Sequence, residues 1–174
     1  MRRACSIAAV VLASGFALAG TGSAGGGRWL DDVPLYTAGE HVDDLPLVAV
    51  LRRDDTANFV SFVYGDCLAS GDAGCAPPAE IQVWPACQRS LGLYDEAQLA
   101  SAERITVRGV TAALFEDGTR LELETGRATV VVFADTRMRV LRIAAALRSV
   151  DGSVRPGRPL PAPSRGVVGG AMGC

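Results

Sequence analysis

The segment from Glu103 to Val150 constrains the fold most, because strand, turn and helix signals follow one another there without a gap. Ile105 and Val107 alternate with polar neighbours, as a half-buried strand does, and Gly109 interrupts the run where a bulge or tight bend is typical. Glu116-Asp117-Gly118 contains the Asp-Gly pair that favours a hairpin turn. The segment therefore predicts short strands joined by tight turns.

Two further strands are predicted after the Asp-Gly turn. In residues 120–124, Arg and Glu alternate with Leu, so the leucines are expected to face the core and Glu122 and Glu124 to face solvent. Gly126-Arg127 forms the next turn. Residues 129–133 read TVVVF, a continuous apolar run that indicates a central strand covered on both faces.

An amphipathic helix is predicted from Thr136 to about Ser149. Asp135 is a suitable N-cap, because its carboxylate can accept amide protons of the first turn. One apolar stripe with i, i+3, i+4 and i+7 spacing is formed by Val140, Ile143, Ala144 and Leu147. Such a stripe must be buried, and the neighbouring sheet is the available partner.

The preceding part of the chain adds more strands. Residues 33–36 suit a short edge strand, 45–51 and 59–64 an antiparallel hairpin, and 81–84 another short strand. Residues 95–103 have a helix-forming composition that predicts one or two turns. The expected fold class is α+β, an antiparallel sheet of five to seven strands with a C-terminal helix packed on one face.

The length of 174 residues suits one domain, which we place at residues 28–150. Residues 1–24 are predicted to be an export signal, with a basic start at Arg2-Arg3, an apolar core and small residues suited to cleavage. An uncleaved anchor is the alternative. After cleavage no transmembrane helix is expected, and the protein would be secreted or held in the cell envelope. Residues 151–174 are rich in Pro and Gly, and we expect a disordered tail.

The charge balance argues against nucleic acid as a partner. The formal net charge is −2, all 17 basic residues are Arg, and no basic cluster is present. The expected partner is a small molecule, a lipid or an envelope protein.

The cysteines indicate disulfides rather than a metal site. Loss of Cys5 with the signal leaves four cysteines in an oxidising compartment: Cys67, Cys75, Cys87 and Cys174. Cys67–Cys75 is the favoured pair, and Cys87 would then pair with Cys174 or remain a buried thiol. Structural zinc is disfavoured because there is no Cys-x-x-Cys and only one His. We therefore predict no metal and no cofactor.

No catalytic set is recognisable. His41, the single histidine, stands among acidic residues in a polar turn, so a solvated loop residue is favoured over a nucleophilic pair. The Asp doublets at 31–32, 43–44 and 54–55 lack calcium-loop spacing. Glu122 and Glu124 would serve a hydrolase only if one of them were buried. Tyr64 and Trp84 flank the cysteine loop and are candidates for lining a cleft, although core packing is the commoner role of both.

Three segments carry a resemblance: FVYGDC at 62–67, GCAPP at 74–78 and IQVWPAC at 81–87. With them the chain resembles a family of exported actinobacterial proteins, which implies export and no particular activity. The strand-turn-strand-helix ending is also similar to small exported domains of the lipoprotein-carrier and anti-sigma-regulator type. That similarity implies binding of a lipid or partner protein inside a curved antiparallel sheet, and it transfers no site residue.

Three functions remain open from the sequence. A non-catalytic binding module is favoured, and it predicts an apolar groove between sheet and helix. A secreted hydrolase requires His41 or an acidic pair to converge on a pocket. A structural envelope protein predicts no sizeable pocket but a large exposed apolar patch.

Overall fold

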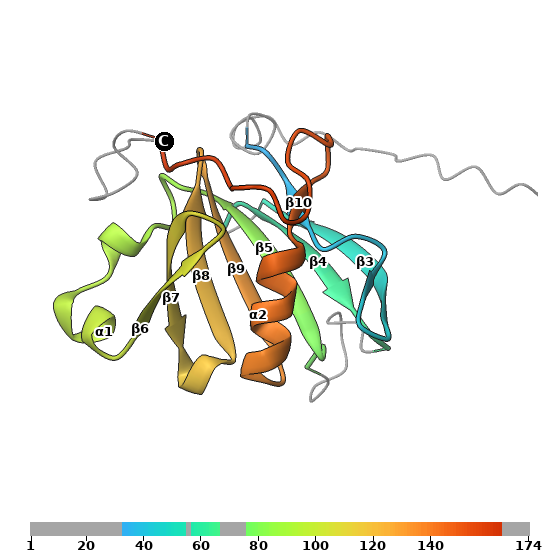
Figure 1. The fold of residues 1–174 in the computed structure, drawn as a ribbon, viewed down its shortest axis with the longest axis horizontal. Helices are drawn as coiled ribbons and strands as arrows, with labels where there is room; N and C mark the ends of the chain where they lie inside the picture. Colours follow the sequence, from blue (N-terminus) through green and yellow to red (C-terminus); the bar gives the residue numbers. More distant parts are fainter. Residues whose placement is uncertain (1–32, 55–56, 67–75, 165–174) are drawn as a thin grey trace, which may run out of the picture.

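The computed structural model describes residues 33–54, 57–66 and 76–164, and these form an eight-stranded antiparallel sheet crossed by one long helix (Figure 1). The α+β class and the C-terminal helix on one face are confirmed. The expected five to seven strands were too few. The short strand that includes His41 was read as a polar turn, since a two-residue strand is too short to show any periodicity.

The large sheet has the order β2-β3-β4-β5-β9-β8-β7-β6. Its strands are β2 (His41–Val42), β3 (Leu45–Arg53), β4 (Phe59–Tyr64), β5 (Ala79–Pro85), β6 (Glu103–Val107), β7 (Val110–Phe115), β8 (Arg120–Thr125) and β9 (Ala128–Ala134). A separate ladder pairs β1 (Tyr36–Thr37) with β10 (Arg148–Ser149). The helices are η1 (Leu91–Leu93), α1 (Glu96–Ala100), η2 (Glu116–Gly118) and α2 (Arg137–Ala146).

Two four-stranded meanders, β2–β5 and β6–β9, lie side by side in this sheet. They join where β5 pairs antiparallel with β9, from Ala79↔Ala134 to Pro85↔Ala128. The predicted hairpin of β3 and β4 is confirmed. The connection of residues 86–102 leads from the centre of the sheet to its β6 edge and carries η1 and α1.

Of the two structures expected at Gly109, a bulge or a tight bend, the chain forms the tight bend, between β6 and β7. Val107 pairs with Val110, so Arg108 and Gly109 alone connect the two strands. Both have positive φ, 48° and 90°, as in the two-residue turns that match strand twist. Gly109 therefore closes a hairpin and does not form a bulge within one strand.

Helix α2 buries the predicted stripe against one face of the sheet. Val140, Ile143, Ala144 and Leu147 are at most 1% exposed, and α2 lies over β8 and β9 (Figure 1). Inward-facing partners from these strands include Leu121, Leu123, Val130 and Val132. The N-cap is Thr136, whose hydroxyl accepts the Arg139 amide, and not Asp135, whose carboxylate pairs with the Arg139 guanidinium.

The opposite face of the sheet is also covered, and two charged residues are buried there. Leu121 and Leu123 face the core as predicted, but Glu122 and Glu124 are only 0% and 4% exposed. They lie beneath the connection 86–102, which hydrogen-bonds to both carboxylates. The prediction that these glutamates face solvent was therefore wrong. The alternation of polar and apolar residues distinguishes the two faces of the strand, but it does not show which face is exposed to solvent.

The first part of the Pro/Gly-rich tail packs against the sheet instead of being disordered. Val154 and Leu160 are buried, and the Leu160 amide donates to the Arg108 carbonyl oxygen at 2.9 Å. The Arg108 guanidinium donates to the carbonyl oxygens of Leu147, Arg155 and Arg158. Residues 151–164 are thus held by hydrogen bonds, and the remainder of the predicted tail lies outside the described residues.

We predict that Arg108→Ala lowers the free energy of unfolding by on the order of 2 kcal/mol, because three carbonyl groups lose a charged donor. Urea unfolding would measure this loss, and faster hydrogen exchange of the Leu160 amide would locate it. Arg127→Ala is the matched control, since Arg127 is an exposed arginine in the β8–β9 turn. Equal stability of the two variants would contradict the prediction.

Candidate functional site

The sheet face opposite α2 carries a buried polar cluster around Glu122. Its Oε1 accepts hydrogen bonds from Arg89 at 2.5 Å and from the Tyr94 hydroxyl at 2.8 Å, and its Oε2 accepts from Arg89 Nε at 3.2 Å. Arg120 Nε lies 3.7 Å from the same carboxylate. Burial, and then the hydrogen bond to Glu122, raise the pKa of Tyr94. Glu122 therefore has its charge compensated within the protein.

Glu124, two residues further along β8, is in a different situation. Its Oε1 accepts the Leu91 amide at 2.7 Å, whereas its Oε2 has no hydrogen-bond partner within the described part of the chain. Burial raises the pKa of the Glu124 carboxyl, the neighbouring Glu122 adds to the rise, and the Leu91 amide opposes it. A buried carboxylate with one oxygen unused retains capacity to accept a donor.

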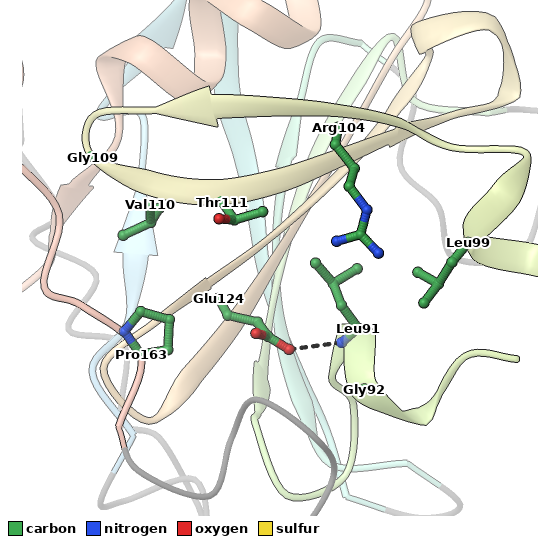
Figure 2. A pocket seen from close by; sticks show the side chains of 9 residues that line it. All are labelled: Leu91, Gly92, Leu99, Arg104, Gly109, Val110, Thr111, Glu124 and Pro163. Carbon is green, nitrogen blue, oxygen red and sulfur yellow. Dashed lines mark hydrogen bonds between the residues drawn. The ribbon is translucent and has the colours of Figure 1, made fainter. Parts of the chain in front are cut away.

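Glu124 forms part of the wall of a cavity of about 400 Å³ (Figure 2). The cavity lies between the connection 86–102, the β6–β7 hairpin, β8 and the tail. The residues that line it are Leu91, Gly92, Leu99, Arg104, Gly109, Val110, Thr111, Glu124 and Pro163. Most of these side chains are apolar, so the few polar groups among them would decide what the cavity accepts.

Arg104 supplies the second charged group of this cavity. It extends from β6, and Figure 2 shows its guanidinium group reaching over the space between Leu91 and Leu99. Within residues 33–54, 57–66 and 76–164 the Arg104 side chain takes part in no ion pair or hydrogen bond. The cavity thus combines apolar walls with two charged groups. These are the Glu124 carboxylate, whose Oε2 has no partner in the described segments, and the Arg104 guanidinium, which has none there either.

The two aromatic candidates do not line this cavity. Tyr64 is fully buried, and its hydroxyl bonds to Thr37, the Ala38 amide and the Gly39 carbonyl. Trp84 stacks on Phe59 with 4.2 Å between ring centroids. Tyr64 therefore packs in the core and fixes the loop after β1, and neither Tyr64 nor Trp84 lines the cavity beside Glu124.

The other candidate residues are scattered. His41 is exposed at the start of β2 and lies opposite Pro46, and it does not line the cavity beside Glu124. Asp43 forms ion pairs with Arg139 and Arg142. In the described segments no group of three or more His, Cys, Asp or Glu residues could hold a metal ion.

The disulfide predictions remain open. Cys67, Cys75 and Cys174 lie outside the described residues, and Cys87 is half-buried in the turn after β5. The pairing of all four cysteines stays a prediction.

A second hollow of about 440 Å³ lies beside α2 and comes closest to the predicted groove between sheet and helix. Val42, Ile143, Ala145 and Ala146 provide its apolar wall, and its charged residues, Asp43 and Arg142, pair with each other. Beneath the helix itself, the space is filled by buried side chains. Because this hollow offers no unused polar group, the Glu124 cavity is the better candidate site.

Comparisons with models of protein families, with curated proteins and with solved structures found no match for this chain. No helix in the described segments is both long enough and apolar enough to span a membrane. The geometry of this chain is therefore the evidence for the candidate site.

We predict that Arg89→Met costs on the order of 3 kcal/mol of unfolding free energy, because it leaves the Glu122 carboxylate buried beside a weaker partner. The double variant Arg89→Met/Glu122→Leu is expected to recover much of this loss, since it removes the uncompensated charge as well. Urea unfolding of both variants measures the difference. A double variant no more stable than the single one would show that the charge is not the cause.

We predict that Glu124→Gln stabilises the protein more at neutral pH than at acid pH. Folding raises the pKa of Glu124, so its favourable contribution is complete below the unfolded pKa and is lost as pH rises through the folded pKa. Gln retains an oxygen for the Leu91 amide and carries no charge. Unfolding free energies measured from pH 4 to pH 7 should diverge as pH rises, whereas Glu40→Gln, at an exposed site, should follow the wild-type curve. Parallel curves for Glu124→Gln would refute the prediction.

Proposed function

We propose that this chain is an exported, non-catalytic binding module that holds a small organic molecule in the cavity beside Glu124. The observation that carries the proposal is a cavity of about 400 Å³ with a largely buried carboxylate, one oxygen of which has no partner among the described residues. Small-molecule sites are typically of this size, mainly apolar, with a few polar groups that orient the ligand. The export signal predicted for residues 1–24 supports placement outside the cytoplasm.

The arrangement of acidic groups favours binding over hydrolysis. A hydrolase that uses two carboxylates needs both of them beside the substrate. Glu122 is hydrogen-bonded to Arg89 and Tyr94 and does not line the cavity. Among the described residues that line it, Glu124 is the only carboxylate. His41 is on the distant β2 strand and cannot supply a base to this cavity.

A purely structural role is less well supported. It predicts a large exposed apolar patch, but in the segments that the structure describes the exposed large apolar side chains come from four separate elements or turns. They are Val48, Val50, Leu93, Met138 and Val150. Single exposed apolar residues of this kind are ordinary on protein surfaces.

The proposal predicts that the mature chain binds N-phenyl-1-naphthylamine, an uncharged probe whose fluorescence increases in an apolar cavity. Thr111→Phe should weaken binding by about tenfold or more, because the new ring fills the space that the probe would occupy. Met138→Phe is the control: Met138 is exposed on α2, on the opposite side of the sheet, and does not line the cavity. Circular dichroism verifies that both variants fold. A wild-type chain that binds no probe, or equal binding by Thr111→Phe, contradicts the proposal.

A further inference from the structure

The two charged side chains of the cavity define its ligand more narrowly, and this step rests on the proposed function. Glu124 comes from β8 and Arg104 from the edge strand β6, and both line the cavity. No ion pair joins them within the described part of the chain, although their charges are opposite. Each is therefore available to a group on a ligand, and Figure 2 shows the Leu91 side chain in the space between them.

The Oε2 oxygen of Glu124, which has no partner in the described segments, can accept a hydrogen bond from a ligand. Although the Glu124 side chain is largely buried, its Oε2 is not among the fully buried polar atoms that lack a partner, so this oxygen is open to the cavity. A ligand that supplies a donor there would replace water at that oxygen. Leu91 already satisfies the other oxygen through its amide, which also fixes the orientation of the carboxylate. An ammonium group is the best match, since charge-assisted hydrogen bonds are about twice as strong as neutral ones.

Arg104 is suited to bind a negatively charged group of the ligand. A guanidinium presents its N–H donors in a planar fork that matches a carboxylate with two parallel hydrogen bonds. Arg104 is exposed, so its contribution to affinity is expected to be smaller than that of buried Glu124. Between the two charges, Leu91, Leu99 and Pro163 offer apolar contact to an uncharged body.

We propose that the cavity binds a small zwitterion with an apolar body, such as an amino acid with an apolar side chain, its ammonium group on Glu124 and its carboxylate on Arg104. A purely anionic ligand would leave the Glu124 oxygen unpaired and bring two negative charges into one cavity. A purely cationic ligand would satisfy Glu124 and leave Arg104 in solvent. The zwitterion alone satisfies both groups and keeps the complex at the charge of the free protein.

Three probes that share a phenyl ring separate these cases: L-phenylalanine, 2-phenylethylamine and 3-phenylpropionate. In calorimetric titrations of the mature chain, L-phenylalanine should bind most tightly and 3-phenylpropionate most weakly. Glu124→Gln should weaken the two ammonium-bearing probes by about tenfold and leave 3-phenylpropionate unchanged or slightly tighter. Arg104→Gln should weaken the two carboxylate-bearing probes only, and Arg127→Gln, at an exposed arginine outside the cavity, should change none.

Two results would overturn the inference. One is 3-phenylpropionate binding as tightly as L-phenylalanine, and the other is no binding of any of the three probes at millimolar concentration. The titration with the uncharged probe N-phenyl-1-naphthylamine separates this failure from failure of the proposed function. If Thr111→Phe still blocks that fluorescent probe, the cavity is a binding site for another class of ligand, whereas loss of both responses removes the proposed function too.

Discussion

The pairing of β5 with β9 is the interaction on which the rest of the structure depends. It joins two meanders into one sheet and places β9 at the centre, where Val130, Val131 and Val132 are fully buried. Successive side chains of a strand point to opposite faces, so a central strand that is apolar on both faces requires cover on both sides. Helix α2 covers one side, and the connection 86–102 covers the other over β8. The candidate site is formed by the second of these covers.

Covering the second face buries two carboxylates, and the protein compensates them differently. Arg89 brings a full positive charge to Glu122, whereas Leu91 brings only a backbone amide to Glu124. Both partners lie in the connection 86–102, two residues apart, and the two glutamates are likewise two residues apart on β8. One carboxylate is thereby committed to holding the connection on the sheet. The other has an oxygen without a partner in the described segments, so two chemically identical side chains on one strand face differ in their contacts.

Local periodicity accounts for what the sequence could predict. The strand ranges 59–64 and 129–133 and the stripe on α2 were predicted because their patterns depend only on neighbouring residues. The burial of Glu122 and Glu124 could not be predicted, since each partner lies 33 positions away in the chain. The cavity is lined by segments from η1 to Pro163, so no local pattern marks it. The sequence contained one weak signal of the burial of these glutamates: an alternating strand at 120–124, and elsewhere in the chain a long connection, 86–102, that carries an arginine and apolar residues.

The tail connects the stability of the fold to the geometry of the site. Pro163 lines the cavity, and its position is set by the hydrogen bonds on either side of it, from the Gly126 amide to Ala162 and from the Ser164 amide to the Gly126 carbonyl. Arg108 holds the preceding part of the same tail and belongs to the hairpin whose Gly109 also lines the cavity. The backbone contacts that order residues 151–164 therefore also form one wall of the cavity. A ligand that contacts Pro163 and Glu124 together would bridge the tail and β8, and its binding free energy would add to the stability of both.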